Sequence, residues 1–215
     1  MQAAEFWNWV AKRYAASPIA DVDAYELTLE RVRAHLRTTD RALELGCGTG
    51  TTALALVDAV EHYTASDCSQ AMLDIGRRKA AESVLGKLDF VVSSAETSTL
   101  GEGRFDVVLS FNLLHLIEDL PGTLAHIRAL LKPGGRFISK TPCWPERAVP
   151  LKYRALTALL PVLRLVNRAP DYVNLRSTRE LEALFRTAGF EIDETGDYPN
   201  HPPSHFVVAR RRGDA

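Results

Sequence analysis

Residues 42–50 read Ala42-Leu43-Glu44-Leu45-Gly46-Cys47-Gly48-Thr49-Gly50, an apolar run that ends in three glycines at alternate positions. The apolar residues predict a short strand, and the glycines predict a turn whose backbone can come close to a ligand because no Cβ intervenes. Helical character resumes at Thr51, so the first backbone amides of that helix lie at the end of the turn. We therefore expect a ligand site between this strand and this helix.

Strand and helix signals alternate along the chain on both sides of this turn. The expected strands are 41–45, 62–66, 88–92, 105–110 and 135–140, with helices at 51–60, 69–82 and 120–131. Helices at 3–14 and 22–37 come first, and a helix at 178–188 with strands 190–194 and 204–209 comes last. Alternating strands and helices pair in parallel through right-handed crossovers. We predict an α/β fold with a Rossmann-like, doubly wound, mainly parallel sheet and a C-terminal antiparallel hairpin.

The domain organisation follows from length and from proline positions. A chain of 215 residues suits one α/β domain, 1–215, with 1–37 as an N-terminal helical cap. Three prolines (Pro142, Pro145 and Pro150) interrupt the alternation, so 142–177 is expected to be a lid-like insertion before the last helix and hairpin. Residues 142–180 carry seven basic and three acidic side chains, a net +4, among leucines and valines. Such a lid suits an apolar or anionic acceptor, but a homodimer interface or a membrane-surface contact through 147–168 fits equally well.

The ligand of the glycine turn is expected to be cationic. A dinucleotide fingerprint reads Gly-x-Gly-x-x-Gly and binds a pyrophosphate, whereas the glycines here are spaced Gly-x-Gly-x-Gly. Glu44 stands two residues before the first glycine, where a carboxylate repels phosphate and attracts an ammonium or sulfonium group. Asp67 follows the second strand, where its carboxylate can accept hydrogen bonds from both hydroxyls of a ribose.

These features resemble the class I S-adenosylmethionine-dependent methyltransferases, from about Tyr14 to Ala209. The matching motifs are the Glu44–Gly50 loop, Asp67 with Met72, Phe105-Asp106-Val107-Val108, Leu131-Lys132-Pro133-Gly134-Gly135 and Ala188-Gly189-Phe190. The resemblance implies that S-adenosyl-L-methionine is the cofactor and S-adenosyl-L-homocysteine the product. It also implies that Gly46, Gly48 and Gly50 hold the methionine part, with Glu44 near its ammonium group.

The resemblance also implies the surroundings of the adenine. Met72 would lie against the base, although packing in the core explains a methionine on a helix equally well. Ala95 and Glu96 would border the base, and Ser94 stands where the family often has an aspartate that binds the adenine amine. Three further residues are expected to border the cofactor: Cys47, Cys68 and Ser110.

Two aromatic or basic side chains are candidates for a more specific role. His115 follows the fourth strand, where it could act as a general base with an ordinary pKa of about 6.5, or could simply pack. Tyr14 resembles the family's N-terminal segment that closes over the cofactor, and its ring could meet the sulfonium or serve packing alone.

The amino-acid composition limits the binding partners that we expect for this chain. The formal charge of −1 argues against nucleic acid, so a small-molecule acceptor is expected. The three cysteines are odd in number and lack metal-ligand spacing, which predicts no metal site and a cytoplasmic location. No segment reaches the roughly 20 apolar residues of a membrane-spanning helix. The alternatives are a methyltransferase acting on protein or nucleic acid, a non-catalytic S-adenosylmethionine-binding regulator and, last, a dehydrogenase.

Overall fold

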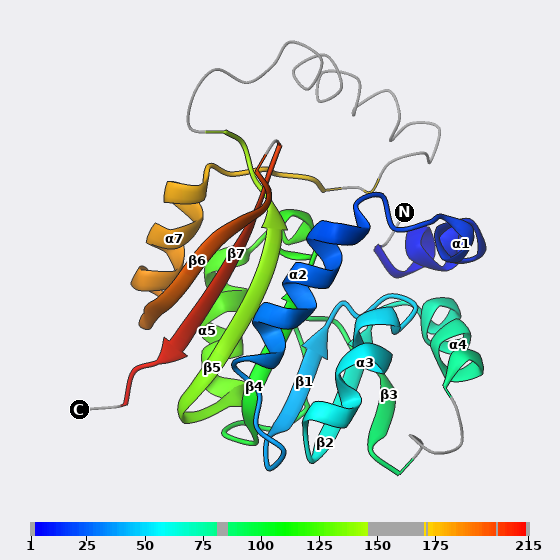
Figure 1. Cartoon of the computed structure of the whole chain (residues 1–215), viewed down its shortest axis with the longest axis horizontal. Coiled ribbons are helices and arrows are strands. Elements are labelled where there is room, and N and C mark those ends of the chain that lie inside the picture. The colour runs from blue at the N-terminus through cyan, green and yellow to red at the C-terminus, as the bar shows by residue number, and fades with distance from the viewer. Residues whose placement is uncertain (1–2, 81–85, 146–169, 171, 201, 214–215) are drawn as a thin grey trace.

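The computed structural model describes residues 3–80, 86–145, 170, 172–200 and 202–213. Within these residues, no helix is long and apolar enough to cross a membrane. Seven strands form one sheet in the order β3-β2-β1-β4-β5-β7-β6 (Figure 1). The strands are β1 (Arg41–Leu45), β2 (His62–Asp67), β3 (Leu88–Val92), β4 (Phe105–Phe111), β5 (Leu131–Pro142), β6 (Phe190–Asn200) and β7 (Pro203–Arg211).

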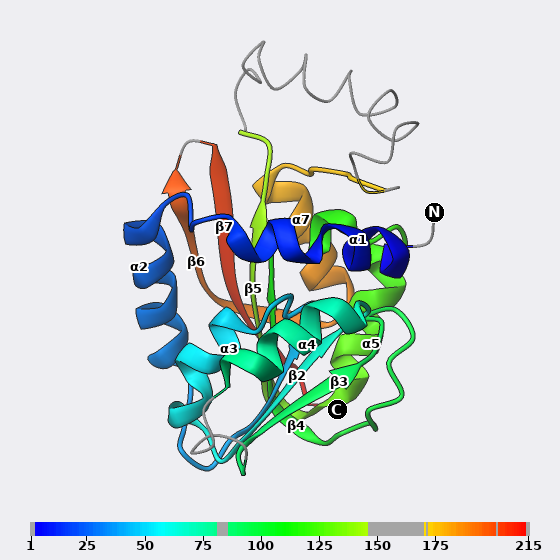
Figure 2. The same cartoon turned by 90° about the vertical axis from the view of Figure 1, so that its right-hand side faces the viewer.

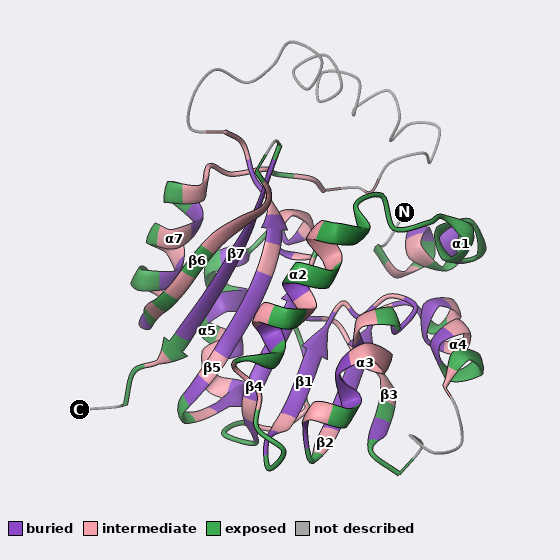
Figure 3. Cartoon of the chain, viewed as in Figure 1, coloured by how far each residue is buried: buried purple, intermediate pink, exposed green. Residues whose placement is uncertain are grey.

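Helices cover both faces of the sheet. They are α1 (Ala3–Ala16), α2 (Val22–Arg33), α3 (Thr51–Leu56), α4 (Gln70–Lys79), α5 (Leu120–Leu130) and α7 (Thr178–Thr187), with short 3-10 turns η1 (Val57–Ala59) and η3 (Leu114–Leu116). One core cluster packs α5 and α7 on one face, and a second packs α2 and α3 on the other. Figure 3 shows the result, with strands buried and the outer sides of helices exposed. Helix α1 packs against α4 through a separate small cluster that includes Phe6, Val10 and Met72.

The parallel register brings the site together. Leu45 of β1 is paired with Ser66 of β2 and with Ser110 of β4, so these three strands end at one edge. The strand order reverses between β1 and β4, and in open α/β sheets ligands bind at such a reversal, beyond the carboxyl ends of the strands. Helix α1 lies over this edge beside α4 (Figure 2).

The predicted fold class is confirmed: β1 to β5 run parallel and the final pair, β6 and β7, is antiparallel. The expected helix 22–37 is wrong at its end, because α2 stops at Arg33 and Asp40 then folds the chain into a turn by accepting from the Arg37 amide. The two strands of the hairpin are longer than the expected 190–194 and 204–209, since β6 extends to Asn200 and β7 spans Pro203–Arg211. The apolar strand β7 lies between β5 and β6 and keeps the more polar β6 in the sheet. Most of the expected lid, including 147–168, lies outside the described residues.

Candidate functional site

The glycine turn after β1 adopts a backbone that other residues rarely take. Gly46, Gly48 and Gly50 have φ angles of 69°, 54° and 70°. A Cβ on Gly46 would lie 2.9 Å from Leu113, and one on Gly50 would lie 2.7 Å from a ring carbon of Phe90. A Cβ on Gly48 would meet only the ring of Tyr14, at 3.7 Å. Gly48 is therefore the glycine with an open side, whereas Gly46 and Gly50 also allow close packing.

Glu44 lies at the floor of the site on β1 and is only 2% exposed. Its Oε2 accepts a hydrogen bond of 2.8 Å from the Tyr63 hydroxyl on β2. Burial, opposed by that hydrogen bond and reinforced by Asp67, raises the pKa of Glu44 from 4.5 to about 7. Tyr63 is a residue that the sequence did not single out; its pKa is raised well above the ordinary value, first by burial and then by Glu44.

Asp67 ends β2 and contacts the glycine turn directly. Its Oδ2 accepts from the Gly48 amide at 2.9 Å, and its Oδ1 accepts from the Ser69 amide at 2.8 Å. Each carboxylate oxygen keeps lone pairs for further donors. Burial raises the pKa of Asp67, although the two amides and the Cys68 thiol oppose the rise. Asp67 therefore contacts the turn at Gly48, and its charge raises the pKa of Glu44, the other carboxylate predicted for this site.

Tyr14 reaches this site from α1. Its ring is half-exposed and lies against Gly48. Burial of its hydroxyl, followed by the charges of Asp67 and Glu44, raises the pKa of Tyr14. The structure therefore places the N-terminal helix over the turn, and the contact of Tyr14 with a cofactor stays a prediction.

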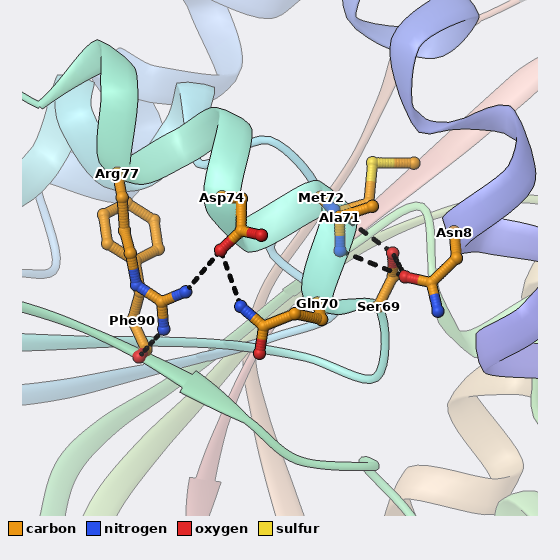
Figure 4. A network of polar contacts seen from close by, with 8 residues as sticks. All are labelled: Asn8, Ser69, Gln70, Ala71, Met72, Asp74, Arg77 and Phe90. Carbon is orange, nitrogen blue, oxygen red and sulfur yellow. Dashed lines mark hydrogen bonds and ion pairs between the residues drawn. The ribbon is translucent and has the colours of Figure 1, made fainter.

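Asn8 holds α1 in this position and was missed by the sequence reasoning. Its Oδ1 accepts from the Ser69 hydroxyl at 2.8 Å and from the Ala71 amide at 3.0 Å (Figure 4). Ser69 also caps α4 by accepting from the Met72 amide at 3.2 Å. Two of the unpaired amides at the start of α4 are thus satisfied by side chains, one of them from α1. The Met72 side chain is buried against α1, and its predicted contact with adenine is untested.

A hydrogen bond from Arg77 attaches the other face of α4 to β3. Asp74 accepts from Gln70 at 2.6 Å and from Arg77 at 2.9 Å, and Arg77 also donates to the Phe90 carbonyl at 2.7 Å (Figure 4). Behind the turn, Lys79 donates to the Thr49 hydroxyl at 2.9 Å, another long-range contact that the sequence did not reveal. The glycine turn is therefore braced from α4 as well as from Asp67.

The residues expected around the base follow β3 and are tied to Asp67, whose carbonyl accepts from the Ser93 amide at 3.0 Å. The Ser94 hydroxyl accepts from the Glu96 amide at 3.2 Å and keeps its own proton to donate. Ala95 is buried and Glu96 is exposed. This arrangement leaves Ser94 and Glu96 available at the rim, and their roles remain predictions.

The cysteines of the site are unsuited to nucleophilic chemistry. Cys47 is buried, and burial together with Glu44 and Asp67 raises its pKa well above the ordinary value. Burial and then Asp67 raise the pKa of Cys68 to about 12. A thiol acts as a nucleophile when its pKa is lowered, so both are expected to line the site as neutral groups.

The other side of the site is formed by the end of β4, where Ser110 is paired with Leu45 of β1. Ser110 is fully buried, and its hydroxyl has no hydrogen-bond partner among the described residues. Asn112 takes a left-handed φ of 55°, which turns the chain into η3. Burial lowers the pKa of His115 to about 4, so its ring is neutral at pH 7 and is a weaker base than an ordinary histidine. Its role as a general base stays a prediction.

The charge of the site indicates what it can hold. No described residue forms a salt bridge with Glu44 or Asp67, so these two buried carboxyl groups have no countercharge within the described ranges. A phosphate there would be repelled, whereas an ammonium or sulfonium would supply the missing charge. Within the described ranges, no group of three or more His, Cys, Asp or Glu side chains could hold a metal ion. The open side of Gly48 and these two carboxylates fit a cationic nucleoside.

Comparison with known proteins agrees with this geometry. The model of a family described as a methyltransferase domain matches residues 42–135. Demethylmenaquinone methyltransferase of Clavibacter sepedonicus is 34% identical over 163 residues, covering 70% of this chain and 65% of that protein. Ubiquinone biosynthesis O-methyltransferase of Aromatoleum aromaticum is 31% identical over 156 residues, covering 72% and 65%. The chain thus spans just under two thirds of the length of these relatives.

The fold is also shared with solved structures. The crystal structure of geranyl diphosphate C-methyltransferase from Streptomyces coelicolor A3(2), in complex with Mg²⁺, geranyl diphosphate and S-adenosyl-L-homocysteine, superposes with a TM-score of 0.70. The two chains are 17% identical, and the match covers 87% of this chain and 79% of the other. At this identity the likeness concerns the fold alone.

Proposed function

We propose that the chain is a class I S-adenosylmethionine-dependent methyltransferase that transfers the methyl group of S-adenosylmethionine to a small molecule, because residues 42–135 match a methyltransferase-domain family and both relatives named above are methyltransferases. The observation that carries the proposal is a pair of buried carboxyl groups that lack a countercharge among the described residues: Asp67, which accepts from the Gly48 amide, and Glu44. A cationic cofactor with a ribose satisfies both. A dinucleotide also offers ribose hydroxyls to Asp67, but its pyrophosphate would add negative charge near Glu44.

In the proposed complex, Asp67 accepts from the ribose hydroxyls and Glu44 attracts the ammonium group. Gly46, Gly48 and Tyr14 surround the methionine part, with Cys47 and Gly50 supporting the turn. Cys68, Met72, Ser94, Ala95 and Glu96 border the base, and Ser110 closes the side of β4. S-adenosylmethionine supplies a methyl group on a positively charged sulfur. The chain's own contribution is to align the acceptor and to exclude water, because the transfer is an in-line displacement.

We propose a small acceptor that is apolar or anionic. The names of the two relatives place them in the methylation of demethylmenaquinone and in ubiquinone biosynthesis, and the solved methyltransferase was crystallised with geranyl diphosphate. All three concern small molecules with apolar parts. This supports the proposed class of acceptor.

Calorimetric titration with S-adenosylmethionine and S-adenosylhomocysteine tests the cofactor assignment. We expect wild type to bind both, and Asp67→Asn to bind at least about tenfold more weakly, because hydrogen bonds to a charged group contribute about 1.5–3 kcal/mol. Asp89→Asn is the matched control, since Asp89 lies on β3, is mostly exposed and pairs with His62. Absence of binding to wild type, or equal binding by Asp67→Asn, would refute the assignment.

Turnover needs a separate test, because a non-catalytic regulator would also bind the cofactor. We expect an extract incubated with the protein and isotopically labelled methyl donor to yield a labelled small molecule, detected by mass spectrometry. Binding without any labelled product would favour the regulator, and label in protein or nucleic acid would favour those acceptors.

Three further proposals concern the surroundings of the enzyme. A cytoplasmic location is proposed because Cys47 and Cys68 are not joined in a disulfide. A homodimer, or contact with a membrane surface through 147–168, is proposed from the basic and apolar sequence of that stretch, which lies outside the described residues. General-base catalysis by His115 is proposed only for an acceptor that must lose a proton.

A further inference from the structure

A second polar site lies beside the proposed cofactor site. The segment 172–177, here called the strap, leads into α7 and crosses above the carboxyl ends of the strands (Figures 1 and 2). It is held by backbone hydrogen bonds of 2.8 Å, from the Asn174 amide to the His115 carbonyl and from the Trp144 amide to the Arg176 carbonyl. Beneath it is a small cavity, here called the strap pocket. Its walls include His115, Thr141, Cys143, Asn174 and Arg176, and its floor consists of leucines.

Two polar atoms in this pocket have no partner. Thr141, on β5, is only 3% exposed, and its Oγ1 has no hydrogen-bond partner among the described residues. The Nδ1 atom of His115 is also buried without a partner there. The cavity is too narrow to admit a water molecule, so solvent cannot satisfy either atom in this conformation. Unsatisfied buried polar groups are rare in folded proteins, so these two atoms are candidates for binding a polar group of a ligand.

The charges that line the strap pocket favour a neutral or anionic ligand group over a cationic one. No carboxylate lines the cavity in the described part of the chain, and Arg176 supplies a positive charge. His115 is neutral at pH 7, because burial lowers its pKa to about 4. Thr141, His115 and Arg176 together offer hydrogen-bond donors to an oxygen atom. A cationic group would meet Arg176 without compensation, whereas a neutral or anionic oxygen would be bound.

The position of the pocket relates it to methyl transfer. Leu113 packs against Gly46 of the cofactor turn, and His115, two residues further along η3, lines the strap pocket. One turn of chain therefore separates the two sites. A molecule held in the strap pocket by one end can direct its other end toward the open side of Gly48.

We propose that the strap pocket anchors the methyl acceptor by an oxygen group, phenolic, carbonyl or carboxylate, that accepts hydrogen bonds from Thr141 and Arg176 and contacts His115. This inference rests on the proposed function and specifies its acceptor. The oxygen enters when the strap moves outward, which breaks the two backbone hydrogen bonds described above. Thr141 and Arg176 are thereby specificity-determining residues and not catalytic ones.

The test uses the full chain and a panel of fragments. Phenol, benzoate and 4-hydroxybenzoate carry the oxygen group, and toluene and benzylamine do not. Binding is measured by saturation-transfer NMR with and without S-adenosylhomocysteine. We expect the oxygen-bearing fragments to bind wild type in preference to the other two. Thr141→Val and Arg176→Met should each weaken that binding about tenfold, the value of one charge-assisted hydrogen bond.

Thermal unfolding separates anchoring from a structural role. Thr141→Val removes an unsatisfied hydroxyl without changing shape, so the ligand-free variant should be as stable as wild type or more stable. Thr64→Val on β2 is the control for threonine replacement, and it should leave fragment binding unchanged. The inference is overturned if no oxygen-bearing fragment binds, if both variants bind like wild type, or if Thr141→Val is clearly less stable than wild type. If S-adenosylhomocysteine does not bind, the proposed function is refuted instead. The fragment titrations made without S-adenosylhomocysteine would then still test whether the strap pocket binds an oxygen group.

Discussion

Replacing Glu44 with glutamine tests the electrostatic basis of the site. The Glu44 carboxyl has a pKa of about 7 in the folded protein against 4.5 ordinarily, chiefly because it is buried. Below pH 4.5 the carboxyl is protonated in both the folded and the unfolded chain, so its burial does not make the stability depend on pH. Between pH 4.5 and 7 the unfolded chain releases the proton first, and stability is lost as pH rises. Above pH 7 the loss is complete and amounts to about 3 kcal/mol, at 1.36 kcal/mol per pKa unit.

Glu44→Gln should remove this loss, because its amide oxygen can still accept from the Tyr63 hydroxyl while carrying no charge. Urea unfolding of both proteins from pH 5 to pH 8 measures the effect. The difference in free energy of unfolding between the variant and wild type should increase in favour of the variant as pH rises, by about 2–3 kcal/mol over this range. Parallel pH profiles for the two proteins would refute the reasoning.

The same substitution bears on cofactor affinity. A cationic ligand favours the ionised carboxylate, and a group of pKa 7 is about one-tenth ionised at pH 6 and about nine-tenths ionised at pH 8. Wild type should therefore bind S-adenosylmethionine about tenfold more tightly at pH 8 than at pH 6, measured by calorimetry. Glu44→Gln should bind more weakly at pH 8 and should lose this dependence on pH. A variant that keeps the wild-type pH dependence would show that another group is responsible.

Three further predictions address the turn, the N-terminal helix and the acceptor side. Gly50→Ala should lower the free energy of unfolding by about 2 kcal/mol or more, because Gly50 has a positive φ and an added Cβ would overlap with Phe90. Gly48→Ala should lower the free energy of unfolding by about 1 kcal/mol and should mainly weaken cofactor binding. Equal losses of stability for the two variants in urea unfolding would contradict this prediction. Asn8→Ala should cost about 1 kcal/mol and speed cofactor dissociation in stopped-flow measurements, and unchanged dissociation would contradict the role of Asn8 in holding α1. The pH–rate profile should show no inflection near 6.5 from His115, and an inflection there that His115→Gln abolishes would contradict its lowered pKa.

Local patterns in the sequence were sufficient for the strands, the glycine turn and Asp67. The strands β1 and β3 begin and end where the apolar runs predict, because each run is bounded by polar or glycine residues. Asp67 lies beside the turn because parallel neighbours end at one edge, a rule that needs no knowledge of side-chain contacts. The fold class follows from the same alternation.

The long-range contacts of the site could not be predicted in this way. Asn8 reaches Ser69 across 61 positions, Tyr63 reaches Glu44 across 19, and Lys79 reaches Thr49 across 30. None belongs to a recognisable spacing, because each depends on how two separately formed elements pack. The length of β6 was missed for a related reason: its polar residues have little strand propensity alone and are held by the buried β7 beside them.

The placement of β7 has a consequence for the order in which the protein folds during synthesis. This strand is inserted between β5 and β6, and its residues Phe206 to Ala209 are completely buried, although it is made after both of its neighbours. Until residues 203–211 leave the ribosome, β5 is an unpaired edge, and Phe137 and Ile138 lack the strand that covers them. A nascent chain halted before that point would present an aggregation-prone border, so completion of this sheet depends on the translation of β7.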